Sequence, residues 1–423
     1  MNIYNNPDKS IWPEIIKRPT MDSAAIFDIV RPVMNQVKCN GDNALRQFAL
    51  QFDGVELQHL QVSDLEMASA EQQLDAALKS AILQAAANIE VFHKKQLQAP
   101  EKTETMPGVW CWRKSVGIDK VGMYIPGGTA PLFSTVLMLA IPAKIAGCKE
   151  IVLCTPPQKN GLVHPAILFA AAITGIKTII KAGGAQAIAA MAYGTQTVPQ
   201  VYKIFGPGNQ YVTAAKQLVQ LEGVAIDMPA GPSEVCVMAD ETAVPAYIAA
   251  DLLSQAEHGS DSQVLLVCNH SAMVTAVERE LEKQLAILPR AAFAAKALEN
   301  SRAIIMNDVE NAIELVNEYA AEHLIIAMKD ATTIADKISN AGSIFIGNYS
   351  PESAGDYASG TNHTLPTNGY ARMYSGVSVD SFVKKITVQE LTPIGLQGIA
   401  ATVIAMAEAE GLEAHANAVR VRL

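Results

Sequence analysis

The chain has 423 residues, of which 50% are hydrophobic and 17% charged, and its formal net charge is -10 at pH 7. This length allows more than one domain, and the apolar fraction is enough for a large buried core. The acidic balance argues against a nucleic-acid-binding protein, because such proteins present basic surfaces to phosphate.

Three features of the sequence bear on where the protein works. The N-terminus has no basic region followed by an apolar run and a cleavage site, so we expect no secretion signal. The longest uncharged run, VGMYIPGGTAPLFSTVLMLAIPA at 121–143, contains prolines, glycines and hydroxyls. It favours strand, turn and buried helix over a membrane span. The six cysteines form no CxxC pair, which is typical of reduced thiols in a cytosolic protein.

Residues 1 to about 115 have a mostly helical pattern, and from about residue 118 short β-rich runs alternate with helical patterns. The expected strands of this first alternating series are KVGMYI at 120–125, EIVLCT at 150–155, TIIKA at 178–182 and YKIFG at 202–206. Between them lie an apolar helix that ends near Ala146 and the helical patterns 164–175 and 184–194, and 209–221 follows the last strand. Such alternation predicts parallel βαβ units with helices on both faces of a sheet.

A second alternating series follows along the chain. Its expected strands are EVCVMA at 234–239, QVLLVC at 263–268, AIIM at 303–306 and LIIAM at 324–328, separated by helices. The segment 347–372 is rich in Gly, Ser, Thr, Asn and Pro and is too long for a simple connector, so we expect a functional loop. A last helix is predicted from Thr392 and Pro393, an N-cap and a first-turn proline, to near Gly411.

The stretch LLSQAEHG at 252–259 ends a predicted helix with Gln255 and His258 three residues apart, so that they are neighbours on its surface. Imidazole is a common zinc ligand, and an amide oxygen is a possible but unusual one. A polar helix end with a solvated histidine explains the same pattern. Alone, the pair therefore leaves both interpretations open.

Glu322 and His323 lie where a predicted helix passes into a strand, a junction at which α/β enzymes place catalytic groups. An adjacent carboxylate and imidazole supply acid and base functions, although an ordinary polar junction has the same composition. Asp356 and His363 stand in the Gly-rich loop and suit metal or substrate binding, or else a simple turn.

The other candidate positions flank glycines. Glu410 and His415 flank Gly411 near the C-terminus, where plain helical surface is the alternative. YIPGGTAP at 124–131 and IFGPGN at 204–209 each follow a strand and precede a helix, a position that attracts anions or cofactor phosphates. Neither matches G-x-G-x-x-G, so by that criterion the dinucleotide signal is weak.

Taken in order, these motifs resemble the histidinol dehydrogenase family over essentially the full length. The resemblance is carried by YIPGGTAPLFSTVLM, AGGAQAIAA, KIFGPGN, DMPAGPSE, DLLSQAEHG, NEYAAEHL, GDYASGTNHTLPT and AEAEGLEAHANAV. It implies a zinc-dependent, cytoplasmic, homodimeric enzyme of histidine biosynthesis (EC 1.1.1.23). The implied reaction is the four-electron oxidation of L-histidinol to L-histidine through L-histidinaldehyde, with reduction of two NAD.

The resemblance also implies roles for individual residues. The zinc ion, one per subunit, would be bound by Gln255, His258, Asp356 and His415, with His415 and Glu410 coming from the partner's tail. His323 would be the base for the hydroxyl proton, and Glu322 the base that activates water against the aldehyde. The zinc ligands and the two bases Glu322 and His323 would also contact the substrate. The further implied substrate contacts are Ser233, His363 and Glu410, and Ser134 is a weaker candidate. The implied NAD contacts are Tyr124, Gln186 and Asn209.

The layout and the family together predict an α/β fold with two Rossmann-like parallel-sheet domains, one inserted in the other. We expect an N-terminal segment 1–23, a discontinuous first domain of 24–122 and 234–377, an incomplete NAD-binding domain 123–233, and a C-terminal helical segment 378–423 that reaches the partner.

Two other classes compete on the residues alone. A metal-dependent hydrolase would use zinc to activate water and would need no NAD. A non-catalytic two-lobed binding protein would tolerate the loss of both Glu322 and His323. A close paralogue that oxidises another amino alcohol also remains open.

Overall fold

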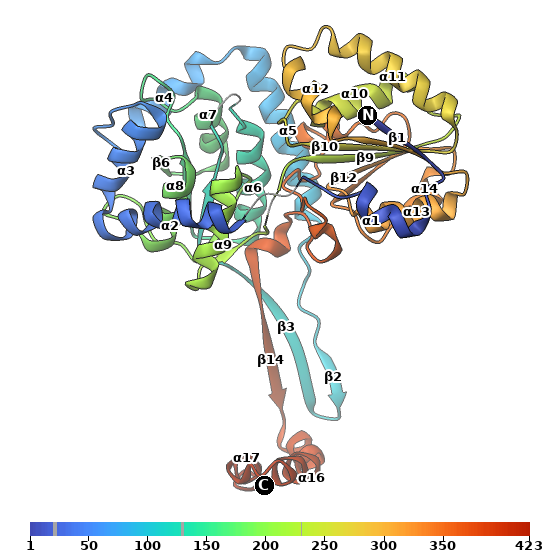
Figure 1. Ribbon diagram of the computed structural model, residues 1–423. Helices are drawn as coiled ribbons and strands as arrows, with labels where there is room; N and C mark the ends of the chain where they lie inside the picture. The colour runs from blue at the N-terminus through green and yellow to red at the C-terminus, as the bar shows by residue number, and fades with distance from the viewer. Residues whose placement is uncertain (20–22, 128–130, 230) are drawn as a thin grey trace.

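The structure is a computed structural model that describes residues 1–19, 23–127, 131–229 and 231–423. It contains a six-stranded sheet of order β1-β11-β10-β9-β12-β13, a five-stranded sheet of order β6-β5-β4-β7-β8 and a three-stranded sheet of order β14-β3-β2. Figure 1 shows the two larger sheets in two lobes, with the three-stranded sheet projecting from them as an arm. The predicted α/β fold with two parallel sheets is confirmed.

The five-stranded sheet is parallel throughout and is covered by helices on both faces. Its strands are β4 (Lys120–Tyr124), β5 (Glu150–Thr155), β6 (Thr178–Lys181), β7 (Lys203–Phe205) and β8 (Ala225–Ile226), and the helices between and after them are α6 (Phe133–Ala146), α7 (Pro165–Thr174), α8 (Gly184–Tyr193) and α9 (Gln210–Leu221). The chain runs from β4 to β6 in one direction and returns to β7 on the other side of β4. The strand order therefore reverses between β4 and β7, the position where open α/β sheets bind ligands.

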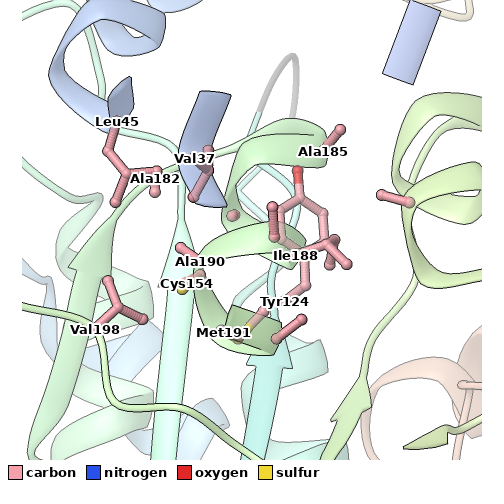
Figure 2. Packing of buried hydrophobic residues seen from close by; sticks show 14 of the residues in the cluster. Val37, Leu45, Tyr124, Cys154, Ala182, Ala185, Ile188, Ala190, Met191 and Val198 are labelled. Atoms are coloured by element: carbon pink, nitrogen blue, oxygen red, sulfur yellow. The ribbon is translucent and has the colours of Figure 1, made fainter. Parts of the chain in front are cut away.

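The N-terminal helices pack on this same lobe. They are α2 (Ser23–Asn40), α3 (Asp42–Phe48), α4 (Asp64–Ala70) and α5 (Ala76–Lys94), with short π and 3₁₀ segments at Ala49–Asp53 and Glu71–Gln73. Val37 and Leu45 share one buried cluster with Tyr124 and Ile188 (Figure 2). The apolar faces of these helices are therefore buried against the five-stranded sheet, and the division of the chain into domains stays a prediction.

The six-stranded sheet is also parallel. Its strands are β1 (Asn2–Asn5), β9 (Glu234–Ala239), β10 (Gln263–Cys268), β11 (Arg302–Ile305), β12 (His323–Ala327) and β13 (Ser343–Ile346). Its helices are α1 (Trp12–Ile15), α10 (Pro245–Ala256), α11 (Ser271–Leu285), α12 (Ala291–Glu299), α13 (Val309–Tyr319) and α14 (Ala331–Ala335), with a 3₁₀ turn at Lys9–Ile11. The predicted N-terminal helical segment thus contributes an edge strand as well, which the sequence prediction missed.

The arm is antiparallel and consists of β2 (Thr103–Met106), β3 (Val109–Gly117) and β14 (Val383–Leu391). None of its strands was predicted: residues up to about 115 were expected to be mostly helical, and the arm strands lack the regular buried–exposed alternation of a half-buried strand. Helices α16 (Pro393–Ala409) and α17 (Glu413–Arg420) lie at its tip (Figure 1). The Thr392 hydroxyl caps α16 by accepting from the Gly395 N–H at 3.0 Å, as predicted.

The functional loop contains the short helix α15 (Glu352–Tyr357) and 3₁₀ turns at Tyr370–Arg372 and Val379–Phe382. In the described part of the chain, no helix combines the length and apolar character needed to cross a membrane.

Gly206 offers a test of how closely β4 and β7 approach each other. Its φ is +121°, and a Cβ there would lie 2.1 Å from the Tyr124 carbonyl oxygen. At Gly147, with φ +82°, a Cβ would meet nothing within 4 Å. We expect Gly147→Ala to cost about 1 kcal/mol from backbone strain alone. Gly206→Ala should cost at least about 2 kcal/mol more, because backbone must move. Urea denaturation of the two variants measures the difference, and equal losses would contradict the close approach.

Candidate active site

The candidate site lies at the amino-terminal edge of the six-stranded sheet. His323 begins β12 and Glu234 begins the neighbouring strand β9, with His323 paired beside Val235. Helix α10 runs back to this edge and ends at Ala256, which brings Gln255 to it. Ligands in open α/β sheets usually lie outside the carboxyl ends of the strands. Glu322 and His323 lie at the helix-to-strand junction between α13 and β12, where the sequence placed them, so this sheet presents its candidate site at the opposite edge.

The backbone of one residue, Glu234, holds both members of the Glu322–His323 pair, which is almost completely buried. The Glu234 N–H donates to Glu322 Oε2 at 2.9 Å, and His323 Nδ1 lies 3.2 Å from the Glu234 carbonyl oxygen. Because a carbonyl oxygen only accepts, His323 Nδ1 carries a proton. His323 Nε2, 3.2 Å from Asp356 Oδ1, is therefore the nitrogen that exchanges a proton.

The charges around His323 set its protonation in this chain. Burial by itself lowers the pKa of His323, but Glu322 and the hydrogen bond to Asp356 raise that pKa well above its ordinary value. Burial likewise opposes the ionised form of Asp356, yet His323 brings the pKa of this carboxyl below its usual value. These opposite shifts favour a proton on His323 Nε2 that is donated to Asp356 Oδ1 in the metal-free chain.

Helix α15 supplies two carboxylates, Glu352 and Asp356, one turn apart. Glu352 is 1% exposed, and its carboxylate accepts hydrogen bonds from the Ser254 hydroxyl and the Gln255 Nε2. Burial raises the pKa of Glu352 to about 7. Glu352 is a site residue that was not predicted from the sequence. It follows Pro351 and lies four residues before Asp356, a spacing that places both carboxylates on one face of a helix.

Side chains able to bind a metal ion gather around Asp356. One ligand atom each from His323, Glu352 and Asp356 lies within 4.8 Å of the other two. The predicted ligand Gln255 is 1% exposed, and its Oε1 is buried with no hydrogen-bond partner among the described residues. His258 lies just beyond the end of α10 with Nδ1 3.1 Å from Ser233 Oγ.

These donors fit zinc, which takes imidazole and carboxylate ligands, and the unpaired amide oxygen suits a cation. A buried acceptor without a donor is costly unless something else satisfies it. The cluster in the structure consists of His323, Glu352 and Asp356. The predicted ligand set also contains Asp356, but combines it with Gln255, His258 and His415.

The loop after Asp356 connects this site to the other lobe. His363 Nδ1 donates to the Asp356 carbonyl oxygen at 2.7 Å, and in the neutral ring Nε2 accepts from the Thr135 hydroxyl at 3.0 Å. Asn362 Nδ2 donates to the Met138 carbonyl oxygen at 2.6 Å. Thr135 and Met138 belong to α6, and the weaker candidate Ser134 is buried beside them. Helix α6, which follows β4 in the five-stranded sheet, therefore packs on the loop that carries Asp356, Asn362 and His363.

The three predicted cofactor residues lie at the carboxyl end of the five-stranded sheet. Tyr124 ends β4, and its hydroxyl accepts from the Gly184 N–H at 3.1 Å. Asn209 Oδ1 caps α9 by accepting from two backbone N–H groups, and Gln186 is buried in α8. A cavity of about 610 Å³ is lined among others by Phe52, Gly127 and Pro156, but none of the three predicted cofactor residues is among its lining residues.

The remaining predicted residues do not lie near this site in one chain. Glu410 follows α16 and His415 lies in α17, at the tip of the arm, remote from β12 (Figure 1). The structure thus brings together Ser233, Gln255, His258, Glu322, His323, Asp356 and His363, but not the tail residues.

Two parallel α/β sheets, a buried carboxylate–imidazole pair and a cluster of side chains able to bind a metal ion are the features of an α/β enzyme with a candidate metal site. The chain belongs to the histidinol dehydrogenase family, whose model matches residues 16–423.

Known relatives support this membership along the whole chain. It is 60% identical over 423 residues to a histidinol dehydrogenase of Bacteroides fragilis, covering 100% of this chain and 99% of the relative. It is 55% identical over 409 residues to the chloroplastic histidinol dehydrogenase of Arabidopsis thaliana, covering 96% and 87%. The crystal structure of histidinol dehydrogenase from Elizabethkingia anophelis superposes with a TM-score of 0.98 at 54% identity, covering 100% of this chain and 98% of that one.

Proposed function

We propose that this protein oxidises L-histidinol to L-histidine through L-histidinaldehyde, reducing two NAD, in the final steps of histidine biosynthesis in the cytoplasm. The observation that carries the proposal is the buried Glu322–His323 pair, held by the backbone N–H and carbonyl of Glu234 beside Asp356, in a chain of this family.

His323 acts as the general base in the first oxidation. Its Nδ1 is committed to the Glu234 carbonyl oxygen, so that Nε2 is the atom that would take the substrate's hydroxyl proton while hydride passes to NAD, once Asp356 binds the metal ion and no longer favours a proton on Nε2. Glu322 takes a proton from the water that attacks the aldehyde. Its Oε2 is held by the Glu234 N–H, which fixes the carboxylate beside His323.

Zinc, one ion per subunit, is bound by Gln255, His258, Asp356 and His415 of the partner subunit. When bound, the ion holds and orients the substrate through its amino and imidazole nitrogens. The free Oε1 of Gln255 and the exposed ring of His258 at the end of α10 support this set. The substrate is also contacted by Ser233, His363 and Ser134 of the same chain. Glu410 of the partner subunit completes these contacts.

NAD binds at the carboxyl end of the five-stranded sheet, in contact with Tyr124, Gln186 and Asn209. The strand-order reversal between β4 and β7 supports this position. Helix α6 follows β4, and its Thr135 contacts His363, which connects the proposed NAD site to the loop that carries Asp356.

The enzyme works as a homodimer in which each tail completes the partner's site. Two observations support this: Ile394 and Met406 of α16 are 74% and 61% exposed, and His415 is remote from the site of its own chain (Figure 1). An apolar helix face left in water is typical of a subunit interface.

The stoichiometry of the reaction tests the proposed function. We expect two NADH per L-histidinol consumed, loss of activity with a chelator and recovery when zinc is restored, because the metal orients the substrate. Absorbance at the NADH band and product analysis measure both quantities. One NADH with released aldehyde would remove the role of Glu322, whereas no NADH from the zinc-loaded dimer would indicate a paralogue with another substrate.

Replacing the proposed base tests the role of His323. His323→Asn should lower the rate of NAD reduction roughly 10²–10⁴-fold, the usual contribution of a general base, while zinc content stays near that of the unmodified protein. Steady-state kinetics and metal analysis measure the two effects. His59→Asn, at an exposed histidine outside the site, is the control. Retained turnover in His323→Asn would exclude His323 as the base.

Mixing two inactive variants tests the shared site. Dimers of His323→Ala and of His415→Ala are each expected to be inactive. If tails exchange, a mixed dimer has one site with both lesions and one intact site. Random remixing after dissociation should then recover roughly a quarter of the full activity, since half of the dimers are mixed. No recovery, with mixed dimers demonstrated by mass spectrometry, would show that each tail serves its own chain.

A further inference from the structure

We propose that Glu352 is a positioning residue that orients the Gln255 side chain so that its amide oxygen, and not its nitrogen, faces the metal ion. This role rests on the proposed function, because it assumes that Gln255 binds the metal.

The geometry begins with two buried side chains from different helices. Gln255 is in the last turn of α10 and Glu352 is the first residue of α15, and each is 1% exposed. Gln255 Nε2 donates to Glu352 Oε2, and the Ser254 hydroxyl donates to Glu352 Oε1. Both carboxylate oxygens are therefore occupied by side-chain donors from α10.

The other end of the amide has no such partner. Gln255 Oε1 is buried and accepts no hydrogen bond from the part of the chain that the structure describes. A buried acceptor in this state costs roughly 1–3 kcal/mol unless a ligand satisfies it. The amide is thus fixed at its nitrogen and open at its oxygen.

The chemistry of the two groups explains the orientation. The two ends of a glutamine amide have nearly the same shape, but one only donates and the other only accepts. Both Glu352 oxygens accept hydrogen bonds here, as an ionised carboxylate does, so the reversed amide would place two acceptors against each other. Glu352 therefore determines which end of Gln255 is free. A metal ion binds the amide oxygen and not the NH2 group, so Gln255 can act as a ligand only in this orientation.

The same contact also strengthens the ligand. A hydrogen bond from the amide nitrogen to an anion polarises the amide and increases the negative charge on its oxygen. The anchor is held in place together with Asp356, because both belong to α15 and are one turn apart. Gly355 lets this helix pack against β13, since a Cβ there would lie 2.6 Å from Cε1 of Phe345.

The rival role for Glu352 is that of a direct ligand, since its carboxylate also lies near His323 and Asp356. The two roles respond differently to Glu352→Gln. The new side-chain oxygen still accepts from Gln255 Nε2, so an anchor survives this change. A direct ligand would lose its negative charge, and metal affinity would fall about as far as in Glu352→Ala.

The experiment measures binding of Zn²⁺ and Co²⁺ to the metal-free dimer by competition with a chromogenic chelator, without substrate or NAD. We expect Glu352→Ala to weaken binding about 10–100-fold, as loss of an outer-shell partner does, and Glu352→Gln to weaken it less than about 5-fold. In the Gln255→Ala background, Glu352→Ala should have no further effect, because the anchor has nothing to hold. Glu257→Ala, which removes a carboxylate from the same end of α10, is the control.

Three outcomes would overturn the proposal. Equal losses in Glu352→Gln and Glu352→Ala, or losses that add in the double variant, would make Glu352 a ligand. Unchanged affinity in Glu352→Ala would leave it no role at the metal. An unmodified dimer that binds neither ion would overturn the proposed function as well. If Glu352→Ala does not fold, Glu352→Met preserves the volume, cannot anchor the amide, and is expected to show the same loss.

Discussion

The active site depends on the two backbone polar groups of Glu234. Its N–H holds Glu322 and its carbonyl oxygen holds His323, so the acid–base pair keeps its geometry only while the start of β9 stays in place. The Glu234 side chain is itself buried, and Arg18 offsets that cost with two hydrogen bonds to the carboxylate. Arg18 also donates to the Tyr319 carbonyl oxygen at 2.7 Å, which joins the end of α13 to the same point.

The second constraint is that opposite edges of two sheets meet at one place. The acid–base pair lies at the amino edge of the six-stranded sheet, whereas the cofactor residues lie at the carboxyl edge of the five-stranded sheet. The loop from Asp356 to His363 joins them, because His363 contacts both the Asp356 backbone and Thr135 of α6. Metal, base and cofactor can therefore lie close together although the two sheets are separate.

The proposed metal site combines residues from three parts of the fold. Helix α10 brings Gln255 and His258 to the site, α15 brings Asp356 with Glu352, and the arm carries His415 away from its own chain. The exposed apolar residues of α16 give the arm a physical reason to pair with a second copy. In the proposed enzyme, dimerisation therefore also completes the metal site.

Local patterns in the sequence were sufficient for the strands of both alternating series, for the Thr392 cap and for the Glu322–His323 junction, because burial period and capping chemistry act within a few residues. The order of its motifs also identified the family. Only the tertiary structure decided which sheet α2 to α5 cover, that polar segments at 103–117 and 383–391 pair as an arm, and that Glu352 holds Gln255. Those outcomes depend on contacts between distant residues, 97 positions apart for Glu352 and Gln255, and a local pattern shows that a side chain is buried without showing what covers it.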